Sequence, residues 1–345
     1  MNNIQSTLYK FSGAGNDFVV IDGRKGGVDE FRTVERIGEL CREYKTDGLM
    51  ILLPPPSAPS LPSSSGLSRG SLVDFVMEFY NPDGSGGMMC GNGGRCITAF
   101  ADMLGLKPAS EDGTWHFLAP DGPHEAKILA RPKEISPRAS LGPNDNTVMP
   151  GAAGESKWTV RLKMIDVKGV TPIKNGFFLN TGTRHYVEFR DNVDSIDMEL
   201  EAKPLRWDPA FQPDGTNVNF VERRQDGLHV RTYEKGVEGE TLACGTGITA
   251  SAIASMVEIS GTSPKMTEGT SPKMTEKAKP SNDERLPVND KGLPENDGVK
   301  LQCRRGDWLS VEFTQNGANY HDVYLTGPAE LVAVLKNGPK TRTTP

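Results

Sequence analysis

The sequence holds few cysteines and histidines for its length. Among 345 residues there are five of each, no two cysteines form a CxxC pair, and no histidines show an HxxxH spacing. These absences argue against a thioredoxin-type redox pair, a zinc ribbon and a metal site. A sparse, odd set of cysteines without a secretion signal is typical of reduced thiols. The cysteines are Cys41, Cys90, Cys96, Cys244 and Cys303.

Long apolar runs and an excess of basic charge are also missing. No apolar stretch approaches the ~20 residues of a membrane-spanning helix, so no membrane partner is expected. The net charge is −6 and the isoelectric point is near 5.5, which argues against a nucleic-acid partner. The first residues, MNNIQSTLYKF, lack the charged start and apolar core of a signal peptide. A cytoplasmic location is therefore expected.

Short runs of β-branched and aromatic residues between turn residues dominate the chain and predict strands. Helices are predicted over 33–44, with Thr33 as a cap, and directly after Cys90 and Cys244. The length allows about two to three domains. The predicted strands are 17–22, 49–53, 73–80, 158–165, 185–189, 217–222, 228–233, 307–313 and 321–326.

Three segments have the composition of loops. Residues 54–70 are rich in Pro and Ser, and residues 136–156 hold few apolar side chains. Residues 261–297 contain GTSPKMTE at 261–268 and again at 269–276, followed by a polar tract. Such compositions do not form a packed core, and two short copies are too few for a solenoid. We predict a flexible surface insertion at about 261–297.

A longer repeat indicates two homologous halves. SGAGNDFVVID at 12–22 resembles TGTRHYVEFRD at 181–191, since both place Ser or Thr before Gly and end in Asp. FYNPDGSGGMMCGNG at 79–93 resembles TYEKGVEGETLACGTG at 232–247, since both reach Cys-Gly after a Gly-containing loop. The offsets are 169 and 154 residues, and the difference of 15 is close to the length of the 54–70 segment. Chance similarity of short Gly-rich segments is the alternative.

Cys90 and Cys244 stand in matching settings, each followed by Gly, a polar residue, Gly and an apolar run. Where a helix begins, its first N–H groups lack intrahelical partners and, with the helix dipole, attract a negative group. A substrate carboxylate can bind these amides, and the pKa of a thiol there is lowered toward neutrality. Two such thiols on opposite sides of one ligand suit the removal of a proton from one face of a carbon and its return on the other.

Other interpretations of the cysteines were weighed against this one. A structural disulfide between Cys90 and Cys244 conflicts with a reducing compartment and with the duplicated glycine settings. A cysteine hydrolase needs a His partner and leaves the second cysteine unexplained. Cys41, Cys96 and Cys303 are predicted to be buried small apolar residues. A thiol redox switch and a catalytically silent binding protein remain alternatives of a different class.

The motifs around these residues resemble those of the diaminopimelate epimerases. The resemblance covers nearly the whole chain apart from the three loop-like segments, and CGNGGRC together with ACGTG is its most specific part. Proline racemases share the two-cysteine architecture but resemble the flanking residues less. The motifs are KFSGAGNDFVVIDG, YNPDGSGGMMCGNGGRC, TGTRHYV, GTNVNFVE, YEKGVEGETLACGTG and YLTGPAE.

The resemblance implies an α/β fold of two pseudo-symmetric domains, each a mixed β-barrel wrapped around a central helix, with the active site in the cleft between them. The expected domains are 1–164, joined by a C-terminal strand at 328–340, and 165–327. The implied enzyme is a cofactor-independent isomerase that interconverts LL- and meso-2,6-diaminopimelate for lysine and peptidoglycan synthesis. No cofactor and no metal are implied, and a homodimer is expected. An epimerase or racemase of another amino acid, such as proline or hydroxyproline, is the nearest alternative.

The resemblance also implies roles for individual residues. Cys90 and Cys244 match the two proton-transfer residues. His185 and Glu234 match positions that tune the cysteine pKa values, although a lone His on a strand is more often a satisfied core residue. The residues that match substrate-binding positions are Asn16, Asn81, Gly91, Asn92, Thr183, Asn217, Glu234, Lys235, Gly245 and Thr246.

The chain departs from the family pattern mainly where the far end of the substrate would bind. Lys235 stands where Arg is usual, which keeps the charge but loses the bidentate fork. Thr183 stands where Asn is common and Arg184 where Pro is common. Arg184 is therefore a candidate for the missing guanidinium. These changes concern recognition of the distal carboxylate rather than the chemistry at the α-carbon.

Overall fold

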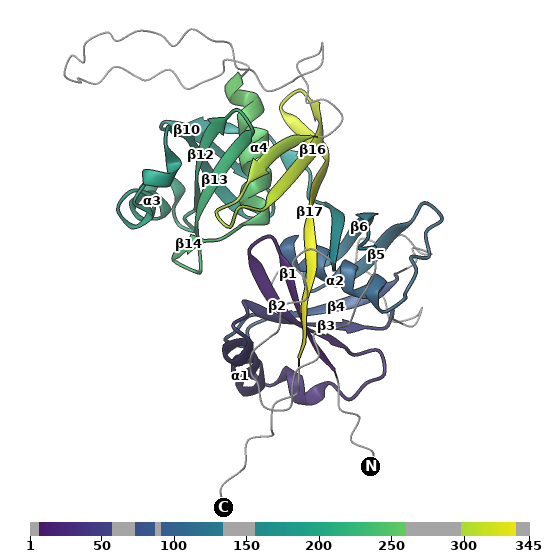
Figure 1. Ribbon diagram of the computed structural model, residues 1–345. Coiled ribbons are helices and arrows are strands. Elements are labelled where there is room, and N and C mark those ends of the chain that lie inside the picture. Colours follow the sequence, from purple (N-terminus) through teal and green to yellow (C-terminus); the bar gives the residue numbers. More distant parts are fainter. Residues whose placement is uncertain (1–6, 57–72, 87–90, 134–155, 260–297, 336–345) are drawn as a thin grey trace, which may run out of the picture. The chain divides into compact units, whose positions relative to one another are not determined.

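The computed structural model describes residues 7–56, 73–86, 91–133, 156–259 and 298–335. Cys90 and the 261–297 segment lie outside the described residues, as do most of 54–70 and 136–156. The chain divides into two units, one of residues 1–163 with 326–345 and the other of residues 164–325. Figure 1 shows the elements of both units. Each unit is described by itself.

The strands of the first unit close into a barrel. The neighbours β1–β2, β3–β4, β5–β6 and β6–β7 pair antiparallel, whereas β2–β3 and β4–β5 pair parallel. Strand β17 pairs with β7 over 327–330 and with β1 over 330–335, which completes the ring. The strands are β1 (Leu8–Gly13), β2 (Asn16–Asp22), β3 (Gly48–Leu53), β4 (Phe75–Tyr80), β5 (Thr114–Ala119), β6 (Gly122–Ala130), β7 (Lys157–Lys163) and β17 (Asn319–Leu335).

The second unit repeats the same order of pairings. Strands β10–β11, β12–β13 and β15–β16 pair antiparallel, whereas β11–β12 and β13–β15 pair parallel. Strand β14 adds a hairpin to β13, β9 pairs with β10, and the start of β17 pairs with β8. The strands are β8 (Val167–Lys168), β9 (Thr171–Ile173), β10 (Gly176–Asn180), β11 (Arg184–Phe189), β12 (Asn217–Arg224), β13 (Gly227–Glu234), β14 (Gly239–Thr241), β15 (Val299–Gln302) and β16 (Trp308–Asn316).

The helices occupy equivalent places in the two units. Helix α1 (Val34–Tyr44) joins the parallel pair β2–β3, and α3 (Met198–Arg206) joins β11–β12. Helix α2 (Gly91–Met103) joins β4 to β5, and α4 (Gly245–Ile259) joins β13 to β15. Short 3-10 helices cover Asp29–Arg32, Val193–Ser195 (η2) and Pro209–Phe211. A shared order of strands and helices supports two homologous halves and argues against chance similarity.

Helices α2 and α4 are the central helices of their units. Nearly every residue of both is buried, from Gly91 to Asp102 in α2 and from Gly245 to Met256 in α4 with Thr246 as the exception. A helix buried all round belongs in the middle of a domain rather than on its surface. Figure 1 shows α4 among β10, β12, β13 and β16. The predicted central helices after the two cysteines are thus confirmed.

Helices α1 and α3 lie on the outside and bury one face each. Ile37, Leu40 and Cys41 of α1 pack into a cluster with apolar residues of β1, β2 and β3. Thr33 caps this helix as predicted, because its side chain accepts a hydrogen bond from the Arg36 amide. Cys96, Cys41 and Cys303 are buried, as expected of small apolar residues.

The structure contains strands that the sequence patterns miss, among them β1, β5, β6, β10 and β15. Strand β6, GPHEAKILA, contains Pro123 and charged residues, so the apolar alternation is weak. Strand β15 has four residues, too few for a clear period. Pairing with neighbours rather than local propensity determines these elements.

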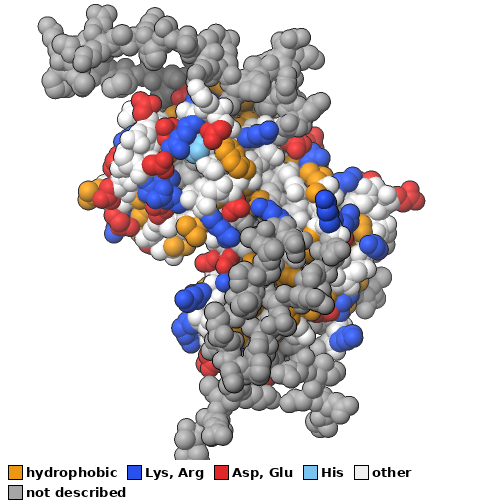
Figure 2. Space-filling model, viewed as in Figure 1, with side chains coloured by type: hydrophobic (Ala, Val, Ile, Leu, Met, Phe, Trp, Pro, Cys, Tyr) orange, Lys and Arg blue, Asp and Glu red, His pale blue; other side chains and the backbone are white. Residues whose placement is uncertain are grey.

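Charges of both signs are interspersed on the visible surface of the described residues (Figure 2). Such a surface agrees with the net charge of −6. No helix within the described ranges is long and apolar enough to cross a membrane.

Removal of the α1 cap tests this local structure. A Thr33→Ala variant is expected to lower the free energy of unfolding by about 1 kcal/mol, because the Arg36 amide loses its acceptor. Urea unfolding followed by circular dichroism measures the change. Thr33→Ser keeps the hydroxyl and is expected to stay within error of the unchanged protein. Equal loss in both variants would contradict a capping role.

Candidate active site

Cys244 stands at the start of the central helix of the second unit. Its carbonyl accepts the first helical hydrogen bond, from the Ile248 amide at 2.9 Å. The residue is only 7 % exposed, and its Sγ lies 3.3 Å from Thr246 Oγ1. The N–H groups of the first turn, which begins at Gly245, have no acceptor within the helix. This end of α4 therefore favours a thiolate or a bound carboxylate.

His185 connects the helix start to strand β11. Its Nε2 lies 2.9 Å from Thr246 Oγ1 and 2.9 Å from Thr183 Oγ1. The two hydroxyl oxygens are 3.1 Å apart. His185 is completely buried, and burial lowers its pKa to about 3. The imidazole is therefore neutral at physiological pH, and hydroxyls join it to the Cys244 sulfur.

Asn217 links Thr183 to the backbone of Arg184 and Lys235. Its Nδ2 donates to Thr183 Oγ1 at 3.2 Å and to the Arg184 carbonyl at 2.9 Å. Its Oδ1 accepts the Lys235 amide at 2.8 Å. The turn that follows Glu234 at the end of β13 is thus held against the start of β12. The structure brings together the predicted residues Thr183, His185, Asn217, Lys235, Cys244 and Thr246.

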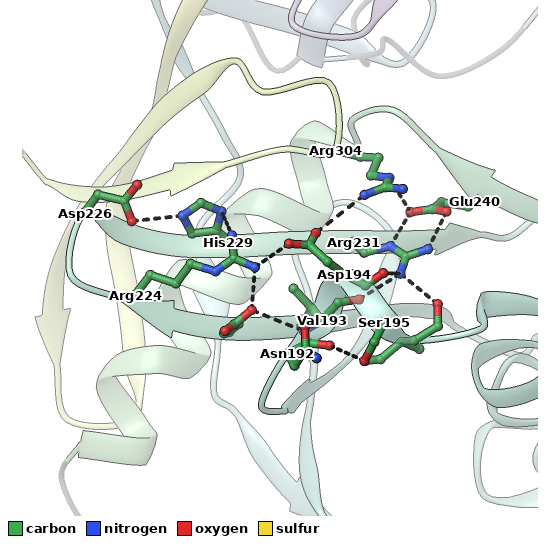
Figure 3. Close-up of polar contacts among 12 residues, drawn as sticks. Asn192, Val193, Asp194, Ser195, Arg224, Asp226, His229, Arg231, Glu240 and Arg304 are labelled. Carbon is green, nitrogen blue, oxygen red and sulfur yellow. Dashed lines mark hydrogen bonds and ion pairs between the residues drawn. The ribbon is translucent and has the colours of Figure 1, made fainter.

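A buried arginine holds the hairpin that carries Lys235 (Figure 3). Arg231 on β13 binds both carboxylate oxygens of Glu240 on β14, at 2.6 and 2.7 Å. Its Nη1 also donates to the carbonyls of Val193 and Ile196, at 2.7 and 2.8 Å, around helix η2. Only 7 % of Arg231 is exposed. A fork of this kind fixes orientation as well as distance, so the β13–β14 hairpin has a rigid base.

Arg184 forms an ion pair with Asp214, with Nη1 and Oδ2 3.1 Å apart. Its side chain is 39 % exposed and that of Asp214 is 56 % exposed. An exposed pair of this kind is weak and can exchange partners. The guanidinium is therefore available to a carboxylate ligand only in competition with Asp214.

The first unit brings Asn16 and Asn92 together. Asn92, the second residue of α2, donates from Nδ2 to Asn16 Oδ1 at 2.6 Å. The fully buried Arg95 donates to Asn92 Oδ1 at 2.7 Å and to the Gly91 carbonyl at 3.3 Å. Asn81 lies past the end of β4, where its amide donates to Ser85 Oγ at 3.0 Å within its own turn. Cys90, which precedes α2, is outside the described residues.

The same contact occurs in both halves with different chemistry. The repeats align Asn16 with His185, and they align Asn92 with Thr246. In each unit these two positions are hydrogen-bonded, at 2.6 Å in the first and 2.9 Å in the second. The second residue of each central helix is thus tied to the adjoining strand, by amides in one half and by imidazole and hydroxyl in the other.

Several residues of the site were not predicted from the sequence. Asn219 donates from Nδ2 to the Tyr186 carbonyl at 3.0 Å, and the same nitrogen lies 3.0 Å from His185 Nδ1. Thr232 donates to Asn219 Oδ1 at 2.9 Å. The available signal was the spacing in NVNF, because residues two apart on a strand share a face and Asn219 follows Asn217 by two.

No group of three or more His, Cys, Asp or Glu side chains that could hold a metal occurs among the described residues. The donors around Cys244 are hydroxyls, amides and one imidazole. Such a neutral set suits a substrate that carries both ammonium and carboxylate groups.

The fold is shared with solved structures of very different sequence. A probable proline racemase from Agrobacterium radiobacter matches with a TM-score of 0.54 at 14 % identity, over 98 % of this chain and 94 % of its own. A phenazine biosynthesis protein of the PhzF family from Enterococcus faecalis matches with a TM-score of 0.52 at 14 % identity, over 96 % and 98 %. The architecture is therefore that of the two-barrel α/β proteins of the PhzF and proline racemase type.

Sequence relatives narrow this class to one family. Residues 177–269 match the family model described as diaminopimelate epimerase. A diaminopimelate epimerase from Chlorobaculum tepidum is 36 % identical, over 93 % of this chain and 97 % of its own. One from Flavobacterium psychrophilum is 32 % identical, over 94 % and 97 %. The chain belongs to the diaminopimelate epimerase family.

The close contact of Gly247 in α4 with Asn219 and His185 can be tested by substitution. A Cβ on Gly247 would lie 2.5 Å from Asn219 Oδ1 and 3.3 Å from His185 Cε1. Gly247→Ala is therefore expected to lower the free energy of unfolding by about 1–3 kcal/mol, measured by urea unfolding. Gly239→Ala is the matched control, because a Cβ there meets nothing within 4 Å. Equal stability of the two variants would contradict this packing.

Burial of neutral His185 also predicts a pH dependence of stability. Its pKa falls from 6.5 to about 3 on folding, so the unfolded chain binds the extra proton between these values. The contribution of neutral His185 to the free energy of unfolding is fully present above about pH 6.5 and is lost as the pH falls toward 3. In His185→Gln, unfolding free energies measured at pH 7.5 and 4.5 are expected to differ less than in the unchanged protein. The same difference in both proteins would argue against a buried neutral imidazole.

Proposed function

We propose that this chain is a diaminopimelate epimerase, an isomerase that interconverts the LL and meso forms of 2,6-diaminopimelate. The observation that carries the proposal is the position of the Cys244 thiol at the start of a buried central helix, beside Thr246 and neutral His185. Membership of the diaminopimelate epimerase family supports the substrate.

In the proposed reaction one cysteine thiolate removes the α-proton and the thiol of the other delivers a proton to the opposite face. The C–H bond breaks, its electron pair delocalises into the α-carboxylate, and a new C–H bond forms with inverted configuration. Cys90 and Cys244 exchange roles between the two directions. Oppositely protonated thiols give a bell-shaped pH profile whose pKa values belong to the pair. No cofactor takes part in the proposal.

Binding of the α-carboxylate is assigned to the helix starts, through Gly91 and Asn92 and through Gly245 and Thr246. The charge that develops in the transition state lies on this carboxylate, so donors placed there act on the rate as well as on binding. The contacts of Thr246 with His185 and Cys244 support its placement in this group.

The distal carboxylate of the substrate is assigned to Lys235. Further substrate contacts are assigned to Glu234, Thr183 and the side-chain amides of Asn16, Asn81 and Asn217. The hydrogen bond between the Lys235 amide and Asn217 supports this grouping for the second unit. Lys235 is preferred to Arg184 as the carboxylate ligand, because its backbone is held by Asn217 while Arg184 would have to exchange Asp214 for the ligand. A role in lysine and peptidoglycan synthesis, a cytoplasmic location and a homodimer follow the family expectation.

Exchange of the α-proton in heavy water tests the chemistry. We expect the reduced protein to convert LL-diaminopimelate into the meso form with deuterium at the inverted centre, followed by NMR and chiral chromatography. Cys90→Ala and Cys244→Ala are each expected to lower the rate by roughly 10²–10⁴-fold or more, because each loses one proton-transfer group.

Cys303→Ala is the matched control, since Cys303 is a buried thiol with no proposed part in the reaction. It is expected to keep full activity. Turnover of proline or hydroxyproline but not of diaminopimelate would replace the proposed substrate. Full activity in either of the Cys90→Ala and Cys244→Ala variants would exclude the two-thiol mechanism.

A further inference from the structure

The amide of Asn219 has a fixed orientation. A backbone carbonyl can only accept, so the side-chain group 3.0 Å from the Tyr186 oxygen is the NH₂. The opposite atom, Oδ1, accepts the Thr232 hydroxyl at 2.9 Å. Asn219 and Thr232 are both buried, with 0 % and 3 % exposed, so water does not compete for these contacts. The Tyr186 carbonyl therefore sets which way the amide faces, and the Thr232 hydroxyl, which can donate or accept, completes the arrangement as a donor.

This orientation determines the tautomer of His185. The Nδ2 that binds the Tyr186 carbonyl also lies 3.0 Å from His185 Nδ1, and its second hydrogen points to that ring nitrogen. A nitrogen that accepts a hydrogen bond carries no proton. Because the buried imidazole is neutral, its single proton is on Nε2, on the side of the two threonines.

The Nε2 proton organises the hydroxyls beside it. His185 can then only donate toward the oxygens of Thr183 and Thr246, and it draws neither hydroxyl proton to itself. Asn217 donates to Thr183 Oγ1 as well, at 3.2 Å. Because Thr183 Oγ1 accepts from both His185 and Asn217, its own hydroxyl donates to Thr246 Oγ1, 3.1 Å away. The Thr246 hydroxyl in turn donates to the Cys244 sulfur, 3.3 Å away.

We propose that Asn219 is a positioning residue, which holds His185 as the Nε2–H tautomer and thereby directs the Thr246 hydroxyl onto Cys244 Sγ. A donor aimed at sulfur favours the thiolate over the thiol. The hydrogen bonds of the Asn219 side chain go to His185, Tyr186 and Thr232, none of which is assigned to the substrate, so Asn219 acts on Cys244 only through other residues. The inference rests on the proposed function only in taking Cys244 as an acid–base group.

Charged side chains on the neighbouring strands could also affect Cys244, but they are the same in all the variants compared below. Arg184 precedes His185 on β11, and Glu234 and Lys235 stand at the end of β13, two and three residues beyond Thr232. All three are retained in every variant below. Asn219→Ala introduces no charge, so a change in Cys244 reactivity in that variant reports the imidazole relay and not a change of nearby charge.

The tautomer is measured directly by NMR of the full protein labelled with ¹⁵N-histidine. We expect one histidine to show protonated Nε2 and unprotonated Nδ1 and to stay neutral from pH 8 to pH 5. His185→Gln identifies this signal by its loss. In Asn219→Asp, which presents only acceptors, the proton is expected on Nδ1. A wild-type His185 with its proton on Nδ1 would overturn the proposal, even if the Asp variant does not fold.

The effect on sulfur is measured by alkylation of Cys244 with iodoacetamide in a Cys90→Ser background, which needs no substrate and no turnover. Asn219→Ala is expected to slow the reaction about tenfold near pH 7, because the thiolate loses an aligned donor. Peptide mass mapping separates alkylation of Cys244 from that of Cys41, Cys96 and Cys303. Ser251→Ala is the matched control, since that buried hydroxyl binds the Gly247 carbonyl within α4, and it should leave the rate unchanged.

A double substitution separates positioning from mere packing. If Asn219 acts through the imidazole, Asn219→Ala is expected to add no further loss once His185 is Ala. An equal additional loss in the His185→Ala background would show that Asn219 only supports the fold, and would refute the proposal. Because alkylation does not involve diaminopimelate, a wrong substrate assignment would leave this result unchanged. Likewise, failure of the Asn219 proposal would leave the substrate assignment unchanged.

Discussion

The burial of an uncharged imidazole under the first turn of α4 is the constraint on which the second unit depends. His185 is wholly enclosed, so each of its nitrogens needs a partner from the protein. Asn219 satisfies one nitrogen, and Thr183 and Thr246 satisfy the other. The helix must therefore begin close to β11, and this proximity sets the thiol of Cys244 at the end of a continuous line of hydrogen bonds.

Small residues make that approach feasible. Gly247 lets α4 lie against the Asn219 amide, where any Cβ would collide with Oδ1. In the first unit Gly13 has the same function, because a Cβ there would lie 2.8 Å from the Asn92 carbonyl oxygen. Both central helices thus lie in close contact with neighbouring backbone or polar side-chain atoms. Rigidity of this kind holds reacting groups in position at little entropic cost during a reaction.

Local patterns predicted the parts of the site that lie near each other in sequence. The Cys-Gly-Thr-Gly turn and the Thr33 cap were visible in the sequence, because each depends on residues a few positions apart. The two halves were visible because short local motifs recur in the same order. Asn219 was not predicted, because its partner His185 is 34 residues away and meets it only through the parallel register of β11 and β12. The orientation of an amide depends on its neighbours in space, so it cannot be predicted from a pattern of residues along the sequence.

Strand β17 makes the N-terminal half depend on the end of the chain. Its residues up to 325 belong to the second unit, and residues 327–335 fill the gap between β7 and β1. When only the first 163 residues have been synthesised, β1 and β7 are open edges, because the strand that joins them is not yet made. The first half therefore completes its sheet last, after the second half has been synthesised. Exposed edges pair readily with other chains, so this order of synthesis leaves the nascent first half open to association until the end.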